Sequence, residues 1–222
     1  MPRTARASAG GVVYHVINRG NGRSTVFHKP ADYDAFIGLI AEACERIDMR
    51  VPGYCLMPNH FHLVLWPRND GDLSRWMQWL MTAHVRRYHS HYHSSGHVWQ
   101  GRFKALPIEA DEHLLVVLRY VERNALRARL VDRAEDWDWT SLVWHGRGKK
   151  PDWLSACPVE RPRGWRELVN TPQTDDEEQA MRHCIQRGSP YGNETWTHRI
   201  ATRLGLEFTL RPRGRPRKDT TK

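Results

Sequence analysis

The chain has 222 residues, enough for one sizeable core with an appendage but not for two large domains. It carries a formal net charge of +9 and a sequence pI near 9.7, which favours a polyanionic partner. No apolar run is long enough to cross a bilayer, the first ten residues do not resemble a signal peptide, and the four cysteines show no zinc-type spacing. We therefore expect a soluble, cytoplasmic and nucleoid-associated protein with reduced thiols, with no contact to a membrane.

Residues 1–11 form a short basic arm, and the alternating residues 12–19 predict a first strand. The loop after this strand contains two glycines together with Arg19 and Arg23. Glycines let a backbone approach closely, and arginines pair with phosphates, so this loop is suited to a nucleic-acid backbone. The alternative is a solvated loop without such a role.

A helix is predicted from residue 30 to about residue 48, and a hairpin follows with strands at 50–57 and 60–66. His60 and His62 lie in the second strand of this hairpin. Because side chains alternate along a strand, both imidazoles face the same way, roughly 7 Å apart. They can converge on one divalent metal ion. The alternative is one histidine in the core and one on the surface.

The next predicted helix, 72–89, carries Arg86 on its outer face, where it can follow a nucleic-acid backbone or simply face solvent. The histidine-rich stretch 89–97 is a rival metal site, but its glycine and serines make a poor template and no carboxylate joins it. Arg102 lies just before the β-strand predicted at 103–109, and Lys104 lies within it. Both can contact the phosphates of a single-stranded nucleic acid. The order strand, helix, strand, strand, helix, strand predicts a ferredoxin-like antiparallel sheet.

Asp111 then begins a helix that runs to residue 124, because an aspartate caps free N–H groups at a helix start. Tyr120 and Asn124 are four residues apart and share one face of this helix. They can place a nucleophilic phenol and an amide ligand beside one metal, or they can simply be core residues. Arg123 is included among the predicted DNA contacts.

The core is expected to close near residues 136–141, so the main domain spans 12–147 and a proline-rich linker spans 148–172. An appendage at 173–210 should contain two helices, the first with a capping box at residue 174 and the second beginning at residue 193. These helices could form a helix-turn-helix DNA reader. The basic tail 211–222 contains Arg213 and Arg215 and is either similar to an AT-hook or a generic basic tail.

Four motifs in the same order are similar to the single-tyrosine HUH transposases, and within them to the REP-associated tyrosine transposase branch. They are the stretch 14–20, Met57-Pro58-Asn59-His60-Phe61-His62, the stretch 98–104, and Tyr120-x-x-x-Asn124. The resemblance covers about residues 12–144. Ala125 departs from the family pattern, because many members have proline there.

The resemblance implies the HUH endonuclease fold, a four-stranded split βαβ sheet with helices in the α+β class. It also implies a DNA transposase with endonuclease and strand-transfer activity, acting in DNA recombination. In this hypothesis His60, His62 and Asn124 bind one Mg²⁺ or Mn²⁺, and Tyr120 forms a 5′-phosphotyrosine intermediate. The implied substrate is a single-stranded REP-like DNA hairpin, and the protein would act as a monomer or homodimer.

Two other classes of function stay open at this point. The chain could be a non-catalytic protein or regulator that holds structured nucleic acid on the same fold. It could also be a metal-dependent phosphoesterase that uses the two histidines without a covalent intermediate. The non-catalytic binding protein requires none of His60, His62, Tyr120 and Asn124. The phosphoesterase does not require Tyr120.

Overall fold

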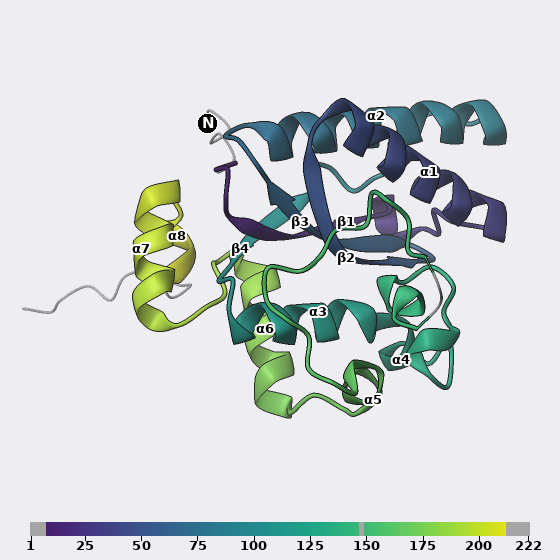
Figure 1. The fold of residues 1–222 in the computed structure, drawn as a ribbon. Coiled ribbons are helices and arrows are strands. Elements are labelled where there is room, and N and C mark those ends of the chain that lie inside the picture. The colour runs from purple at the N-terminus through teal and green to yellow at the C-terminus, as the bar shows by residue number, and fades with distance from the viewer. Residues whose placement is uncertain (1–7, 147–148, 212–222) are drawn as a thin grey trace, which may run out of the picture.

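The computed structural model describes residues 8–146 and 149–211 of the chain (Figure 1). The helices and strands follow in the order β1 (Val13–Arg19), α1 (Pro30–Arg46), β2 (Met49–Met57), β3 (His60–Pro67), α2 (Asp72–Tyr92), β4 (Lys104–Ile108), α3 (Glu112–Glu122), α4 (Asn124–Arg127), α5 (Trp165–Asn170), α6 (Asp175–Arg187), α7 (Glu194–Leu204) and α8 (Glu207–Leu210). Short 3-10 turns lie at Asn21–Arg23, Ala134–Asp136 and Ser141–Trp144.

The four strands form one antiparallel sheet in the order β2-β3-β1-β4. This order is that of the ferredoxin-like βαββαβ arrangement, so the predicted fold class is confirmed. In the central pair, His62 lies opposite Ile17 and His60 lies opposite Arg19. Because partners across a ladder share a face of the sheet, both histidines and the end of β1 face the same side.

Helices α1 and α2 cover the other face of the sheet, as Figure 1 shows above the strands. Phe36 of α1, Phe61 of β3 and Trp76 of α2 are fully buried in this layer. Helix α2 runs three residues beyond the predicted end and stops where His93 takes a left-handed conformation with φ of 48°. Part of the histidine-rich stretch is therefore helical, and no metal-type cluster forms there among the described residues.

Helix α3 packs on the histidine face of the sheet, below the strands in Figure 1. Leu114, Leu118 and Val121 are fully buried there. Gly53 of β2 allows this close approach, because a Cβ at that position would lie 2.6 Å from Cδ2 of Leu118. The two sides of the sheet thus have different partners, and the helix with the candidate nucleophile lies on the histidine side.

The segment predicted as a linker contains α5, whose Trp165 and Val169 are buried against α3. Its prolines predicted a linker, but these two apolar side chains dock it on the main domain. The predicted capping box at Thr174 and the cap at Asn193 are both present at the starts of α6 and α7. Helix α8 was not predicted.

The outer edge of β4 is covered by the chain before α7. The backbone N–H of Tyr191 donates to Pro107 O, and the N–H of Glu109 donates to Tyr191 O, both at 2.9 Å. This pairing supplies hydrogen-bond partners for an edge strand that would otherwise be open. It also places the start of α7 beside the end of β4, where Asn193 donates to the Glu109 carboxylate (Figure 1).

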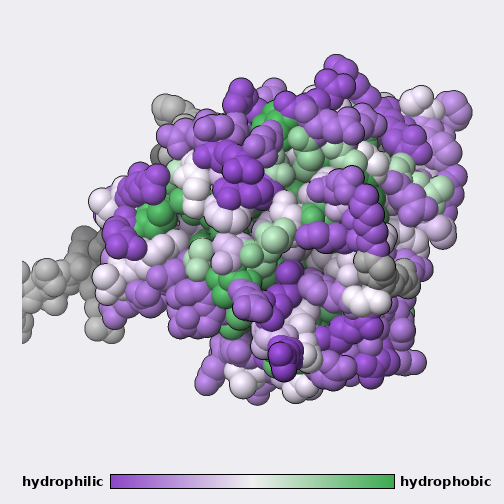
Figure 2. Space-filling view, in the orientation of Figure 1, coloured by the Kyte–Doolittle hydropathy of each residue, from purple (hydrophilic) through white to green (hydrophobic). Residues whose placement is uncertain are grey.

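The predicted basic arm is described only from residue 8, and there it packs on the chain before α2. The N–H of Gly71 donates to Ser8 O at 2.7 Å, and the N–H of Gly10 donates to the Asp70 carboxylate. The face shown in Figure 2 is mostly hydrophilic, with small scattered hydrophobic patches. None of the described helices is long and apolar enough to span a membrane.

Candidate active site

The two strand histidines lie on the α3 side of the sheet with their rings 5.0 Å apart, centre to centre. The Nδ1 atom of His60 contacts Asn59 Oδ1 at 2.7 Å, and Nδ1 of His62 contacts Nε2 of His15 at 2.8 Å. Within the described chain, Nε2 of His60 and Nε2 of His62 have no hydrogen-bond partner. Both rings therefore present the same nitrogen as the free atom.

The histidine rings are held in their neutral form. Burial, followed by the nearby charges of Arg19 and Arg127, lowers the pKa of His60 to about 4. Burial, followed by its histidine neighbours, lowers the pKa of His62 well below the ordinary value, and burial lowers the pKa of His15 to about 3. Neutral imidazole is the form that binds metal ions, so the rings need not lose a proton first.

Tyr120 reaches the histidines from the last turn of α3. Its ring meets His62 edge to face, with centroids 5.9 Å apart, and its side chain is only 5% exposed. Asn124 is equally buried, but it begins the separate short helix α4. Only Arg123 separates the two helices, and it keeps right-handed helical dihedral angles with its N–H donating to Arg119 O at 2.9 Å, so the predicted helix is interrupted at one residue. The break occurs although Ala125 is not proline.

Two residues of this site were missed in the sequence. The Arg127 guanidinium lies 4.1 Å from the centre of the Tyr120 ring, and its Nη2 donates to Asn124 Oδ1 at 3.1 Å. A spacing of three from Asn124 and seven from Tyr120 is a helical signal that could have indicated it. His15 lies within the first quoted motif, but its contact with His62 depends on strand register, which sequence alone does not specify.

The site offers two imidazole nitrogens and an amide oxygen, a donor set that suits a divalent ion such as Mn²⁺ or Mg²⁺. Asn124 Oδ1 already accepts the Arg127 hydrogen bond, but an amide oxygen has a second lone pair. The Nδ2 atom of Asn124 is buried and has no partner among the described residues. The donor set of two neutral imidazoles and an amide oxygen is compatible with a divalent ion on the His60 and His62 side, whereas the unpaired Asn124 Nδ2 is a hydrogen-bond donor and cannot bind a cation.

The predicted DNA contacts fall into four groups, one of which, Arg86 with Arg102, lines a cleft. Arg19 and Arg23 are exposed at the end of β1 and in the turn after it, beside His60. Lys104 is exposed and donates to Ile185 O at 3.2 Å, whereas Arg123 donates to the carbonyls of Val169 and Asn170 and so holds the end of α5. The tail residues predicted to bind DNA, Arg213 and Arg215, lie outside the described residues.

Arg86 and Arg102 line an open cleft of about 740 Å³ between α2 and the segment 96–103. Both arginines are exposed, whereas Trp99 at the cleft is 5% exposed and its Nε1 has no partner in the described chain. Asn18, one residue before Arg19, also lines the cleft. The cleft thus combines apolar walls with two positive charges near the end of β1.

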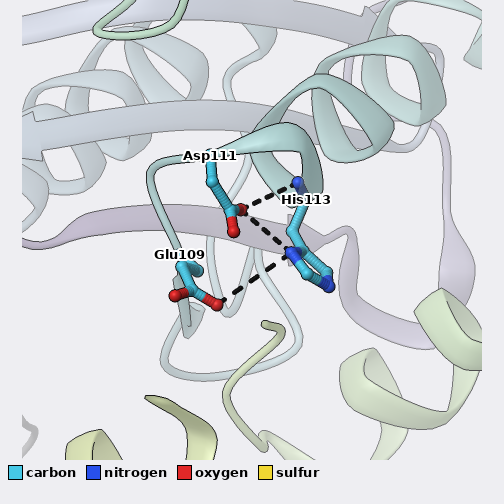
Figure 3. A group of neighbouring side chains, drawn as sticks. All are labelled: Glu109, Asp111 and His113. Carbon is cyan, nitrogen blue, oxygen red and sulfur yellow. Dashed lines mark hydrogen bonds and ion pairs between the residues drawn. The ribbon is translucent and has the colours of Figure 1, made fainter. Parts of the chain in front are cut away.

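A second cluster lies at the junction of β4 and α3, where the ligand atoms of Glu109, Asp111 and His113 lie within 4.8 Å of one another (Figure 3). Asp111 Oδ1 accepts from the backbone N–H of His113 and contacts Nδ1 of the same residue, both at 2.9 Å. The Glu109 carboxylate accepts from the backbone N–H and the side-chain amide of Asn193. These contacts cap α3 and fasten the start of α7.

Comparison with known proteins places this arrangement in a family. The sequence model described as "Transposase IS200 like" matches residues 8–124, which include His60, His62, Tyr120 and Asn124. The chain belongs to the IS200-like transposase family. Membership assigns DNA nuclease and strand-transfer chemistry as the class of activity and implies a divalent metal ion as its cofactor.

Individual relatives agree with this assignment. A Haemophilus influenzae protein named as a REP-associated tyrosine transposase is 27% identical over 123 residues, covering 50% of this chain and 69% of its own. The solved structure of a REP-associated tyrosine transposase bound to a REP hairpin has a TM-score of 0.54 at 19% identity, and the match covers 72% of this chain and 95% of that one. The predicted resemblance to the REP-associated branch is confirmed.

A crystal structure of a protein named as a transposase from Deinococcus radiodurans matches with 19% identity over 47% of this chain and 85% of its own, with a TM-score of 0.38. The matched region of the family model ends at Asn124, so Arg127 and the helices after α4 lie beyond it.

Proposed function

We propose that this transposase cleaves and rejoins single-stranded DNA hairpins of the REP type through a covalent bond to Tyr120. The observation that supports this most is the edge contact between the Tyr120 ring and His62, which brings a hydroxyl-bearing side chain against one of the two neutral strand imidazoles. A protein that only binds nucleic acid requires none of these buried groups. The REP hairpin is bound by the structural relative and is carried over to this chain as part of the proposal.

In this proposal His60, His62 and the amide oxygen of Asn124 hold one Mg²⁺ or Mn²⁺. When bound, such an ion would supply Lewis-acid stabilisation of the negative charge on the scissile phosphate. The two histidines supply Nε2 atoms, since each Nδ1 is already engaged by Asn59 or His15. Asn124 stays oriented by its hydrogen bond from Arg127.

The phenolic oxygen of Tyr120 attacks phosphorus and loses its proton as the new bond forms. The bond from phosphorus to the leaving 3′ oxygen breaks and that oxygen takes up one proton, equal to the one that the phenol loses, which gives a 5′-phosphotyrosine and a free 3′-OH. The Arg127 guanidinium over the ring supplies positive charge close to this phosphate. Because a phosphodiester is retained, another 3′-OH can displace the tyrosine and rejoin the strand without ATP.

The direct test uses purified protein, Mn²⁺ and a pool of single-stranded DNA hairpins labelled at the 3′ end. We expect a labelled protein band on a denaturing gel that is lost with EDTA, and peptide mapping should place the DNA on Tyr120. Cleavage without an adduct would favour the phosphoesterase. Binding without cleavage or adduct, over hairpins drawn from the host's repeats, would favour the non-catalytic binding protein.

We further propose that the single strand runs along the cleft lined by Arg86 and Arg102. Each substitution, Arg86→Ala and Arg102→Ala, should weaken hairpin binding and lower the slope of log K against log salt by about 0.7, since each removes one phosphate contact to a single strand. Fluorescence anisotropy at several salt concentrations measures this slope.

The matched control for the cleft is Arg182→Ala on α6. Arg182 is ion-paired with Glu178 on a helix whose first turn is acidic, so it should leave both affinity and slope unchanged. Slopes equal to that of the wild type in both cleft variants would show that the strand does not pass through this cleft.

A further inference from the structure

His15 is a buried titratable residue that the mechanism above does not use. It is 0% exposed and lies on β1, on the same side of the sheet as His62. The two ring planes are within 23° of each other, with centres 5.1 Å apart, while Nε2 of His15 lies only 2.8 Å from Nδ1 of His62. The rings therefore meet edge to edge in nearly one plane, which is the geometry of a hydrogen bond between them.

One proton must lie between these two nitrogens, because one has to donate and the other has to accept. If His15 donates, neutral His62 carries its own proton on Nε2, and that nitrogen cannot bind a metal ion. If His62 donates from Nδ1, its Nε2 keeps a free lone pair. The direction of this one hydrogen bond thus decides whether His62 is a ligand.

The Nδ1 atom of His60 also contacts a neighbouring side chain, that of Asn59, and the atom that faces it can only accept a hydrogen bond. Asn59 Nδ2 donates to Arg23 O at 3.1 Å, so Asn59 Oδ1 faces His60 Nδ1 and accepts its proton at 2.7 Å. His60 therefore has its proton on Nδ1 and its lone pair on Nε2. The two histidines offer matching nitrogens only when His62 also donates from Nδ1.

We propose that His15 is a positioning residue that accepts the Nδ1–H of His62, orients its ring and leaves Nε2 free for the divalent ion. His15 is not itself a ligand, since its Nε2 accepts from His62 and its Nδ1, which then carries the ring proton, is buried without a partner in the described chain. The groups that face it are His62, the Tyr120 ring at 6.1 Å and the charge of Arg127. This inference rests on the metal site of the proposed function.

The test compares His15→Leu, which cannot accept a hydrogen bond, with His15→Gln, whose side-chain oxygen can reach the position of Nε2. Mn²⁺ binding is measured by calorimetry on the full chain without DNA. We expect His15→Leu to weaken Mn²⁺ binding by about 10- to 100-fold, the usual effect of removing such a partner, and His15→Gln to stay within a few-fold of the wild type. Thermal melting of each variant checks that it is folded.

A second readout needs no variant at His15. Nitrogen NMR of the wild-type histidine rings, metal-free and with Mg²⁺, reports which nitrogen of His62 carries the proton. We expect protonated Nδ1 in the Mg²⁺-loaded protein. A proton on Nε2 in that state, or unchanged Mn²⁺ affinity in folded His15→Leu, would overturn the proposal.

The variant His60→Ala distinguishes a failure of the proposed metal site from a failure of the positioning role of His15. If it abolishes Mn²⁺ binding while His15→Leu does not, the metal site stands and only the positioning role is refuted. If neither substitution changes Mn²⁺ binding, the proposed metal site is refuted together with the role of His15.

Discussion

Replacing Tyr120 by phenylalanine is expected to lower strand cleavage and adduct formation by at least about 10³-fold, because the substitution removes the attacking oxygen. The ring itself stays, with its contacts to His62, His15 and Arg127. Hairpin affinity and the fold should therefore stay close to those of the wild type. Single-turnover assays with DNA labelled at its 3′ end measure the loss, since the 3′ fragment stays attached to the protein.

The matched control is Tyr191→Phe, a half-buried tyrosine whose ring contacts His113 at the start of α3. It should cleave as the wild type does. Cleavage at the wild-type rate in Tyr120→Phe would mean that water is the nucleophile and that the protein is a metal-dependent phosphoesterase. Loss of DNA binding along with cleavage would mean that Tyr120 acts in recognition instead.

Local patterns in the sequence predicted the elements of this fold well. The alternation of residues 60–66 gave both histidines one face, and Asp111 caps α3 by accepting from the N–H of His113. Both signals act over a few residues, so no knowledge of the fold is needed to use them. The capping box at Thr174 was predicted correctly for the same reason.

The contacts that complete the site act over long distances in the sequence. His15 and His62 meet only because β1 and β3 pair in one particular register, and a shift by one residue would turn His15 to the opposite face. The break before Asn124 could not be predicted, since Arg123 has ordinary helical propensity. Its guanidinium holds carbonyls of α5, in a segment whose prolines had suggested a linker.

The contacts of Glu122 could not be predicted from local sequence patterns either, because its partners lie 19 to 43 residues away. It is fully buried directly after the tyrosine turn, with Ser141 Oγ donating to it at 2.7 Å and Trp165 Nε1 donating at 2.6 Å. Arg161 and His145 approach the same carboxylate at 3.6 and 3.7 Å. This carboxylate joins the end of α3 to α5 and to the Ser141–Trp144 turn.

Glu122→Ala is therefore expected to lower the free energy of unfolding by about 3–5 kcal/mol, since it leaves Arg161 and the two buried donors without their acceptor. Glu122→Gln keeps the shape and one acceptor oxygen, so it should lose less. Glu112→Ala, at an exposed position in the first turn of the same helix, should change stability by no more than about 1 kcal/mol. Urea unfolding measures all three, and equal effects at positions 112 and 122 would contradict this role.

The pH dependence gives an independent check on the charge of Glu122. Burial alone would raise its pKa, but His145, Arg161 and Ser141 outweigh burial and hold the pKa below the ordinary value of 4.5. A carboxylate whose pKa is lower in the folded state than in the unfolded state stabilises the fold at pH values above its unfolded-state pKa. This contribution is lost as the pH falls through the folded-state pKa. The stability difference between wild type and Glu122→Gln should thus be constant near neutral pH and shrink below about pH 4.5. A difference that grows on acidification would mean that Glu122 is protonated in the folded protein, and its contacts with Ser141 and Trp165 would then be those of a neutral acid.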